Sequence, residues 1–547
     1  MEHILSWMTF FPLLGAALIV VLPERYKDSF KKIALVSLAV PLILAVHLFF
    51  AFDSTLAANP RVLRATAPDL DVRTYGLQFV EHVVWIRSFN IEYFVGVDGV
   101  SITMVLLSAL VSFIAGLASY LVNKPVEPHH GSLTGIAVKE RGYYALLLLL
   151  ATGMMGVFVA LDMFLFYVFW ELMLLPMYFL IGIWGGPRKE YAAIKFFLYT
   201  LLGSVLMLLA IIYMYYYGTP TRGEFFLADG TPTANRHTFN MMYLAYHTQF
   251  EWVSFVSAKL IWVLFFIGFA IKIPMFPFHT WLPDAHVEAP TAISVILAGV
   301  LLKMGTYGIL RINFPMFPAE TAWASTAMAV FGTINIVYGA LCAMAQKDFK
   351  SLVAYSSISH MGFVLLGMSS FTVEGMNGAV MQMFNHGTIT SMMFLLVGVI
   401  YDRAHHRDLD GFGGLAKAMP VYAGFAGFAF FAALGLPGLS GFIGEVLVFL
   451  GAFQTHRVLT IISASGVILA ASYVLWMVHR VFLGPLRREE YASFSDLNWR
   501  EVATLLPLAA IVLFLGFYPM PVLDLMSAQL GALKDAVLTA VGPVAGM

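Results

Sequence analysis

The sequence predicts an all-α membrane protein with many spanning helices. Of its 547 residues, 60% are hydrophobic and only 12% are charged, and the mean hydropathy is +0.82. A soluble domain carries roughly 25% charged residues. The apolar residues also form runs of about 20, the length that a membrane-spanning helix requires. The net charge of −1 provides no basic field that would attract nucleic acid.

About fourteen spanning helices are expected from this length rule. They cover residues 4–22, 33–52, 99–122, 142–160, 163–184, 191–217, 255–282, 292–313, 321–344, 350–370, 374–400, 420–455, 458–482 and 502–520. The N-terminus reads MEHILSW and lacks the basic region of a cleavable signal, so the first run is expected to be a retained helix.

Two of these runs are long and interrupted by helix-breaking residues. Residues 255–282 contain Pro274 and Pro277, and residues 420–455 contain the segment Gly435-Leu-Pro437-Gly438. Proline removes a backbone donor and clashes with the preceding turn. In a membrane, an interrupted helix persists only where protein or water satisfies its backbone.

The two interrupted helices are separated by five positions in the helix order, which predicts two inverted repeats of five helices, residues 142–313 and 321–483. Discontinuous helices in inverted repeats meet at ion sites near the middle of the membrane. Residues 1–141 then form an N-terminal unit of three helices with a long outer loop. Residues 484–547 form the last helix and a C-terminal tail.

The distribution of Lys and Arg predicts the orientation of the chain. These residues are about twice as common in one set of alternate connections, which includes Lys350, as in the other, which includes Arg311. The rule places the connection after the first helix in the cytoplasm and both termini outside. Two long polar insertions, 53–97 and 219–253, then lie outside, and the first contains an amphipathic segment, EHVVWIRSFNIEYF.

Four ionisable residues lie within otherwise apolar helices: Glu171, Lys272, Lys303 and Glu445. A charge at the centre of a bilayer costs roughly 2.5–3.5 kcal/mol on insertion scales. Such groups persist where they pair with each other, face a protein interior or line a hydrated path. The four residues therefore indicate an ion or proton route.

Glu171 and Lys272 are expected to be partners, because a neighbouring opposite charge favours the ionised form of each group. The alternative is a static ion pair that only fixes helix packing. We favour a functional pair, because a purely structural pair is replaceable by apolar residues at little cost.

Lys303 lies near the centre of its helix, where desolvation disfavours the charged ammonium and makes reversible proton uptake feasible. The alternative, snorkelling to an interface, requires a long reach from this depth. Glu445 follows the break in residues 420–455. It is a second candidate proton carrier, and it also suits the start of a helix, where the helix dipole favours a carboxylate.

Several other residues are weaker candidates. Lys195 and Lys259 lie about five residues inside a helix end. At a rise of about 1.5 Å per residue this is a short distance, so each ammonium could also reach the membrane surface by snorkelling. His279, His360 and His386 are candidate proton carriers, with haem ligation or satisfied core histidines as alternatives. Asp98 and Asp162 suit helix N-caps.

No cofactor site is expected in the chain. The sequence contains neither the P-loop pattern nor a strand–GxGxxG–helix unit, so no nucleotide or flavin site is predicted. Its single cysteine, Cys342, excludes an intrachain disulfide and a cysteine-ligated iron–sulfur cluster. We also expect no metal site.

The segment KIPMFPFHTWLPDAH (272–286), followed by Glu288-Ala-Pro-Thr-Ala, is long and specific. It resembles the antiporter-like subunits of NADH:quinone oxidoreductase, respiratory complex I, a family that includes subunits of Mrp-type sodium/proton antiporters. Supporting segments are LAGVLLKMGTYGILR, QKDFKSLVAYSSISHMGFVLLG and GLPGLSGFIGE. An acidic residue at the position of Glu445 resembles the chain M type, which is homologous to mitochondrial subunit 4, whereas the other types typically carry lysine there.

The resemblance implies roles for these residues. Glu171 and Lys272 would be the family's charged pair, Lys303 its central lysine and Glu445 the terminal exchange group. Three further residues would assist: Lys195 matches a family lysine, and His360 and His386 carry protons along a hydrated axis. His279 is an auxiliary candidate on the broken helix.

The resemblance also implies a place in a larger complex. The chain would be a proton-translocating subunit in a bacterial inner membrane, next to chains L and N. NADH, FMN, iron–sulfur clusters and quinone would belong to partner subunits. The main alternative is an Mrp-type antiporter subunit, and a third is a membrane-bound enzyme with its own active site.

Overall fold

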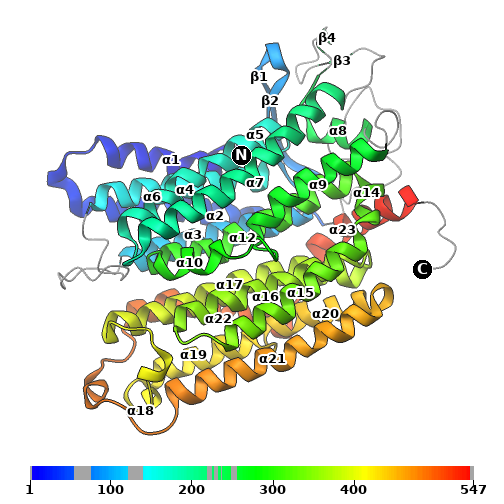
Figure 1. Cartoon of the computed structure of the whole chain (residues 1–547). Coiled ribbons are helices and arrows are strands. Elements are labelled where there is room, and N and C mark those ends of the chain that lie inside the picture. The colour runs from blue at the N-terminus through cyan, green and yellow to red at the C-terminus, as the bar shows by residue number, and fades with distance from the viewer. Residues whose placement is uncertain are drawn as a thin grey trace.

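The protein is a bundle of long helices (Figure 1). The computed structural model describes residues 3–54, 76–120, 139–218, 225–226, 232–233, 235, 237–247 and 255–541. Twelve of the described helices are long and apolar enough to cross a membrane, judged by length and composition. The predicted all-α membrane fold is therefore confirmed.

The helices follow the predicted runs to within a few residues at most ends. Those of the N-terminal part are α1 (Ile4–Val21), α2 (Lys27–Ala51), α3 (Gly99–Tyr120), α4 (Glu140–Val159), α5 (Met163–Leu172), α6 (Leu174–Trp184), α7 (Lys189–Tyr217), α8 (Met241–His247), α9 (Phe255–Lys272), α10 (Trp281–Glu288), α11 (Thr291–Ile296), α12 (Leu302–Gly308), α13 (Phe314–Met316) and α14 (Pro318–Trp323). Those of the C-terminal part are α15 (Ser325–Met344), α16 (Phe349–Ser369), α17 (Val373–Ala404), α18 (Leu415–Ala418), α19 (Pro420–Ala433), α20 (Ser440–Thr455), α21 (Arg457–Phe482), α22 (Trp499–Phe517) and α23 (Met520–Val541).

The long helix α17 joins the two parts of the bundle. It packs against α16, α19, α20 and α22 of the C-terminal part and also against α3 and α11 of the N-terminal part. In Figure 1 it lies along the boundary between the two groups of helices. Side chains on α17 can therefore contact residues from both parts.

Both predicted helix interruptions are present. The first separates α9, which ends at Lys272, from α10, which begins at Trp281. The second separates α19 from α20, and Gly435 and Gly438 within it have φ of 80° and 90°. These left-handed conformations are readily adopted only by glycine. The proposed inverted relation between the two sets of helices stays a prediction.

One end of the bundle carries elements that the sequence did not specify. The first polar insertion contains an antiparallel hairpin, β1 (Gln78–Ile86) and β2 (Ile91–Val97), which includes the predicted amphipathic segment. Residues 55–75 of this insertion lie outside the described residues. So does most of the second insertion, apart from α8, a short pairing of β3 (Phe225–Phe226) with β4 (Pro232–Thr233), and a few neighbouring residues.

Two carboxylates tie the hairpin end together, and both are the helix caps that the sequence predicts. Asp162 accepts hydrogen bonds from the backbone amides of Phe164 and Leu165 at the start of α5 and from the amide of Glu92 on β2. Asp98 caps α3. The tail expected after residue 520 contains a further helix, α23, which packs against α3, α14 and α17.

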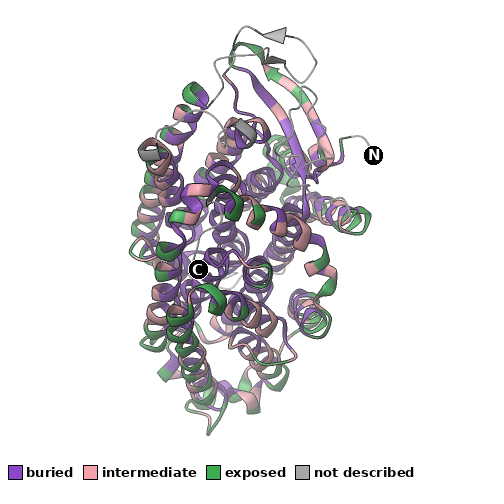
Figure 2. Cartoon of the chain, turned by 90° about the vertical axis from the view of Figure 1, so that its right-hand side faces the viewer, coloured by how far each residue is buried: buried purple, intermediate pink, exposed green. Residues whose placement is uncertain are grey.

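Burial follows the pattern of a protein surrounded by lipid. The interior is densely buried, and exposed residues lie around the outside of the bundle (Figure 2). On α7 the exposed side chains include Leu198, Leu202 and Leu209, each more than half exposed. A stripe of exposed leucine is unfavourable in water and suits contact with acyl chains.

A close approach between α22 and the second helix break generates a stability prediction. A Cβ atom on Gly516 would lie 2.2 Å from the carbonyl oxygen of Gly438, so Gly516→Ala forces the two backbones apart. We expect a loss of roughly 1–3 kcal/mol, the usual cost of overpacking. The thermal unfolding midpoint of the purified protein measures it.

Gly427→Ala is the matched control, because a Cβ atom at Gly427 in α19 meets nothing within 4 Å. This variant should unfold at the wild-type temperature or slightly above it, since alanine favours helix over glycine. Equal midpoints for the two variants would contradict the packing described here.

Candidate functional site

The site is centred on Lys303, which is fully buried in the middle of the bundle. Its spanning segment, Thr291–Met316, contains two π-helical turns, η6 (Leu297–Leu301) and η7 (Ile309–Asn313), on either side of α12. π-Helical turns occur frequently at functional sites, because the extra residue disturbs regular hydrogen bonding. Here the Lys303 ammonium donates to the carbonyl oxygen of Ala298 in η6, at 2.5 Å.

The second contact of Lys303 is with His386 on α17. The distance from Lys303 Nζ to His386 Nδ1 is 2.5 Å. When the lysine is protonated, Nδ1 accepts this hydrogen bond and the ring proton lies on Nε2. That Nε2 atom is buried and has no hydrogen-bond partner among the described residues. It is therefore available to pass a proton onward.

His360 on α16 is next to His386. Their ring centroids are 5.6 Å apart, and Nδ1 of His360 lies 3.5 Å from Oε1 of Glu445 and 3.4 Å from Nε2 of Gln382. A small cavity with room for about one water molecule is lined by His360, His386 and Glu445. One water can thus bridge the separation between the two imidazole rings.

Glu445 ends this row of side chains at the second helix break. It lies on α20, five residues beyond Ser440, and is only 6% exposed. A Cβ atom on Gly435 would lie 2.6 Å from Glu445 Oε2, so the break needs glycine here for space as well as for its φ. The helix interruption therefore makes room for the carboxylate.

The structure thus brings together four of the predicted site residues in the order Lys303, His386, His360 and Glu445. These residues come from α12, α17, α16 and α20. We call this row the central chain. It crosses from the N-terminal to the C-terminal part of the bundle at the contact between Lys303 and His386.

Glu171 and Lys272 interact electrostatically without direct contact. Among the described residues, no ion pair within 4 Å joins them, although Glu171 is close enough to act on Lys272 electrostatically. The Lys272 ammonium instead lies 5.4 Å from the ring centre of Trp170 and 5.6 Å from that of Phe196. The partnership of Glu171 and Lys272 therefore stays a prediction: the two groups interact electrostatically, and the aromatic faces give the ammonium further favourable contacts.

Glu171 is held at a local irregularity of its helix. It is the penultimate residue of α5, and the helix resumes as α6 after Met173. Its Oε1 atom is buried without a hydrogen-bond partner among the described residues. Tyr167, four residues earlier, forms a side-chain hydrogen bond with Glu171, so the carboxylate has one partner and one oxygen that can still accept another.

Lys195 and His279 lie near the first helix break and outside the central chain. Lys195 forms an ion pair of 2.7 Å with Asp284 on α10. His279 is buried between α9 and α10, where it stacks on Phe276 and meets Tyr338 edge-on. The ion pair with Asp284 thus holds the Lys195 ammonium beside the first helix break.

His286 and Lys350 are two of the buried basic residues that the sequence analysis missed. His286 on α10 is fully buried, stacks on Phe394, and has no partner for either ring nitrogen among the described residues. Both Lys303 and Lys350 act on it electrostatically. Lys350, assigned from sequence to a surface connection, is only 2% exposed and donates to Ala289 O at 2.5 Å.

The sequence contained a sign that Lys350 is buried, but none for His286. Lys350 begins a predicted apolar run, and the N-cap Asp348 two residues earlier places it inside the first helical turn. His286 belongs to the proline-rich segment after Lys272, which conceals the short helix α10. No cluster of three or more His, Cys, Asp or Glu side chains within the described ranges is suited to hold a metal ion.

Comparison with known proteins identifies the family of the chain. Residues 160–470 match a family described as NADH:quinone oxidoreductase/Mrp antiporter, TM. NADH-quinone oxidoreductase subunit M of Rhodobacter capsulatus is 41% identical, with 97% of this chain and 96% of the relative covered.

Two solved structures are similar along nearly their whole length. A chain of respiratory complex I from Thermus thermophilus with bound NADH has a TM-score of 0.79 and 27% identity, covering 98% of this chain and 100% of that one. A chain of the Mrp complex from Dietzia sp. has a TM-score of 0.76 and 20% identity, covering 98% and 99%, which shows a shared fold. From the family match and the subunit M relative, the chain belongs to the transmembrane NADH:quinone oxidoreductase/Mrp antiporter family.

Proposed function

We propose that this chain is a proton-translocating membrane subunit of an NADH:quinone oxidoreductase. The central chain is the observation that carries the proposal, because it is a nearly continuous row of buried proton carriers from the middle of the bundle to the second helix break. The relative in Rhodobacter capsulatus is named for this complex. Buried ionisable side chains of this kind mark proton relays in membrane proteins.

In this proposal, protons reach Lys303 from the side of Lys350 and His286. His286 has two ring nitrogens without partners among the described residues, and it is under the electrostatic influence of both lysines. A neutral imidazole can accept a proton at one nitrogen and release one from the other. His286 is therefore suited to carry protons from the buried end of α16 towards Lys303.

The transfer away from Lys303 follows its hydrogen bonds. The ammonium gives a proton to Nδ1 of His386, and His386 releases its Nε2 proton towards the cavity it shares with His360. His360 then passes a proton to the Glu445 carboxylate, 3.5 Å away. Glu445 then releases a proton beyond the second helix break. His386 is left with its proton on Nδ1, so the chain returns to its initial state only after that proton moves back to Nε2, by a ring flip or a change of tautomer, and Lys303 is protonated again.

Glu171 and Lys272 would control this transfer electrostatically. Lys272 ends α9, which packs against α12, the helix that carries Lys303. A positive Lys272 makes a second positive charge at Lys303 less favourable, and a partnered Glu171 lessens that effect. Movement of Glu171 towards or away from Lys272 would therefore couple events outside this chain to proton release from Lys303.

The redox chemistry would take place in partner subunits. NADH, FMN, iron–sulfur clusters and quinone belong to those partners in this proposal, and chains L and N are the expected membrane neighbours. The membrane is a bacterial inner membrane with both termini of this chain outside, as the distribution of Lys and Arg predicts. The contribution of this chain is to hold and move protons at Lys303, the two histidines and Glu445.

Removal of the central lysine tests the route. In the assembled complex, Lys303→Ala should lower NADH-driven proton uptake into inverted membrane vesicles by roughly tenfold or more, equivalent to at least about 1.4 kcal/mol of barrier. Lys259→Ala is the control, because Lys259 lies in the first turns of α9 beside Trp323, away from the central chain. Wild-type proton uptake in Lys303→Ala would refute the route.

Neutralisation of Glu171 tests the electrostatic control. Glu171→Gln keeps the side-chain size but cannot hold a charge near Lys272, so NADH:quinone activity and proton uptake should fall together while the complex assembles normally. Glu374→Gln, at an exposed position in the first turn of α17, should leave both unchanged. Unaltered proton uptake per NADH oxidised, at the full rate, would count against a role for Glu171.

The Mrp-type antiporter remains the second candidate, because its fold is also similar to that of this chain. Purification of the chain from its native membrane distinguishes the two functions. Co-purification with subunits that contain flavin and iron–sulfur clusters is the result that our proposal requires. Isolation with membrane subunits alone, together with sodium/proton exchange in the absence of NADH, would favour the antiporter.

A further inference from the structure

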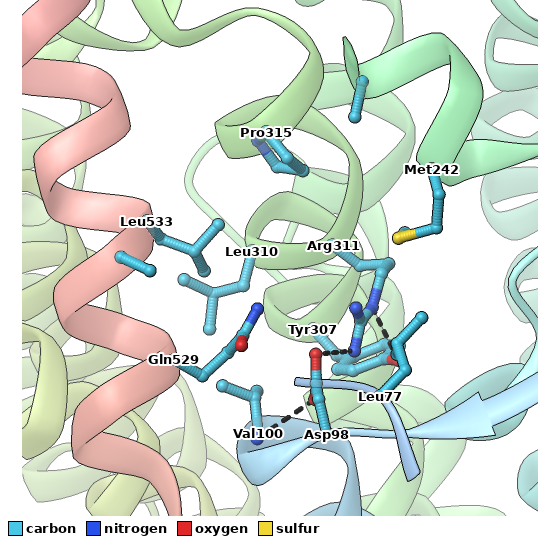
Figure 3. Close-up of a pocket in the computed structure, with 12 residues that line it drawn as sticks. Leu77, Asp98, Val100, Met242, Tyr307, Leu310, Arg311, Pro315, Gln529 and Leu533 are labelled. Carbon is cyan, nitrogen blue, oxygen red and sulfur yellow. Dashed lines mark hydrogen bonds and ion pairs between the residues drawn. The ribbon is translucent and has the colours of Figure 1, made fainter. Parts of the chain in front are cut away.

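A second buried cluster of charges lies on the same helical segment as Lys303, at the end of the bundle that carries the β-hairpin. It contains Asp98, Tyr307 and Arg311 and forms the floor of an apolar pocket (Figure 3). We propose that this cluster is a proton seal: it separates water in the pocket from Lys303 and so prevents leakage past the central chain.

The cluster is closed by hydrogen bonds within itself. Arg311 pairs with Asp98 at 2.7 Å and donates from Nε to the Tyr307 hydroxyl at 3.0 Å. That hydroxyl donates to the carbonyl oxygen of Phe158 at 2.9 Å. The other Asp98 oxygen accepts from the backbone amides of Val100 and Ser101. Asp98 and Arg311 are only 1% and 7% exposed.

The pocket brings water-accessible space directly to this cluster. It has room for a few water molecules, and its walls are mostly apolar side chains from several elements. These include Met242 on α8, Leu310 and Pro315 above the cluster, and Leu533 on α23 (Figure 3). Gln529 of α23 is a further polar residue of the lining. The Asp98–Arg311 pair is therefore the polar layer that faces this space.

The cluster can act as a seal because it lies between the pocket and Lys303. Lys303, Tyr307 and Arg311 are spaced by four residues, which places them along one side of a helix. Tyr307 is thus one turn from Lys303 and Arg311 one turn further. If water passed this layer, Lys303 could exchange protons with the hairpin end of the bundle without the transfer to His386.

The chemistry of the three residues suits a seal better than a relay. Arginine does not release its proton in proteins, and Arg311 is held in place by Asp98 and Tyr307. The Asp98 carboxylate already accepts hydrogen bonds from three donors. Tyr307 both donates and accepts a hydrogen bond, and its hydroxyl is fixed. None of the three is free to exchange a proton with the pocket.

The alternative is that the pair only stabilises the fold. A buried ion pair contributes little net stability compared with apolar residues of the same size, so stability alone does not account for two charges at this depth. A seal accounts for them, because three groups that bond to one another leave water in the pocket no free donor or acceptor of this cluster through which a proton could pass towards Lys303. The two roles differ in one measurable property, which is passive proton permeability.

The test uses the complete complex in liposomes without NADH. A proton gradient is imposed across the membrane, and its decay is followed with a pH-sensitive dye. Arg311→Ala should accelerate the decay several-fold. Arg403→Ala is the matched control, since it breaks a partly buried pair at 2.8 Å between the last turn of α17 and Glu501 in the first turn of α22, and it should leave the decay unchanged.

The route of the leak is tested in the same assay. The inference rests on the proposed role of Lys303, so the double variant Arg311→Ala with Lys303→Ala should decay at nearly the wild-type rate. A leak that persists in the double variant would place the path elsewhere and overturn the seal as stated. Lys303→Ala alone, assayed with NADH, tests the proposed function separately, because that experiment does not depend on Arg311.

A variant that removes both charges covers the case in which Arg311→Ala does not assemble. Asp98→Asn with Arg311→Met leaves no unpaired buried charge, a type of replacement that folded proteins tolerate. It should also leak several-fold faster than the wild type. A complex with either Arg311 variant that holds the gradient as well as the wild type would overturn the proposal.

Discussion

The contact between Lys303 and His386 is the interaction on which the rest of the site depends. It joins α12 of the N-terminal part of the bundle to α17 of the C-terminal part, and both side chains are buried. An ammonium in this environment needs a hydrogen-bond partner, because an isolated charge in a low-dielectric interior is strongly unfavourable. Ala298 and His386 provide two partners, and only His386 is able to take the proton onward.

Helix irregularities explain how the remaining groups are placed. The break before Ser440 brings Glu445 to the end of the central chain, and the break after Lys272 ends α9 among aromatic rings. π-Helical turns on both sides of Lys303 reorient its segment. In a lipid environment, irregular backbone is affordable only where protein or water satisfies it. The same irregularities therefore serve the fold and position the proton carriers.

The sequence predicted the helices and their breaks well, but it predicted the contacts within the site poorly. Apolar run length located nearly every long helix, because a bilayer imposes a length on every spanning segment. Glycine and proline located both breaks. The order of Lys303, His386, His360 and Glu445 could not be predicted, since it depends on packing between α12, α16, α17 and α20. Sequence pattern also gave no indication that the Lys272 ammonium would lie over the rings of Trp170 and Phe196.

The burial of Lys350 and of Arg311 was not predicted, for the same physical reason in both cases. Lys350 and Arg311 looked like surface charges near helix ends, because charge and sequence position do not reveal which ends are buried. Arg311 lies one π-helical turn beyond α12 and is paired across the bundle with Asp98, more than 200 positions away in the chain. Such long-range pairing is a property of the tertiary structure. Asp98 is the predicted helix cap, and it also forms an ion pair with Arg311 that the sequence did not indicate.

The central claim is that the two histidines act in series along one route. The measurement that tests it most directly is a double-mutant cycle of His360→Gln and His386→Gln, read as the rate of NADH-driven proton uptake by the assembled complex. Groups that act as one unit give strongly non-additive losses. The account predicts that the double variant is no slower than the slower single variant. Losses that multiply would show independent roles and contradict the account.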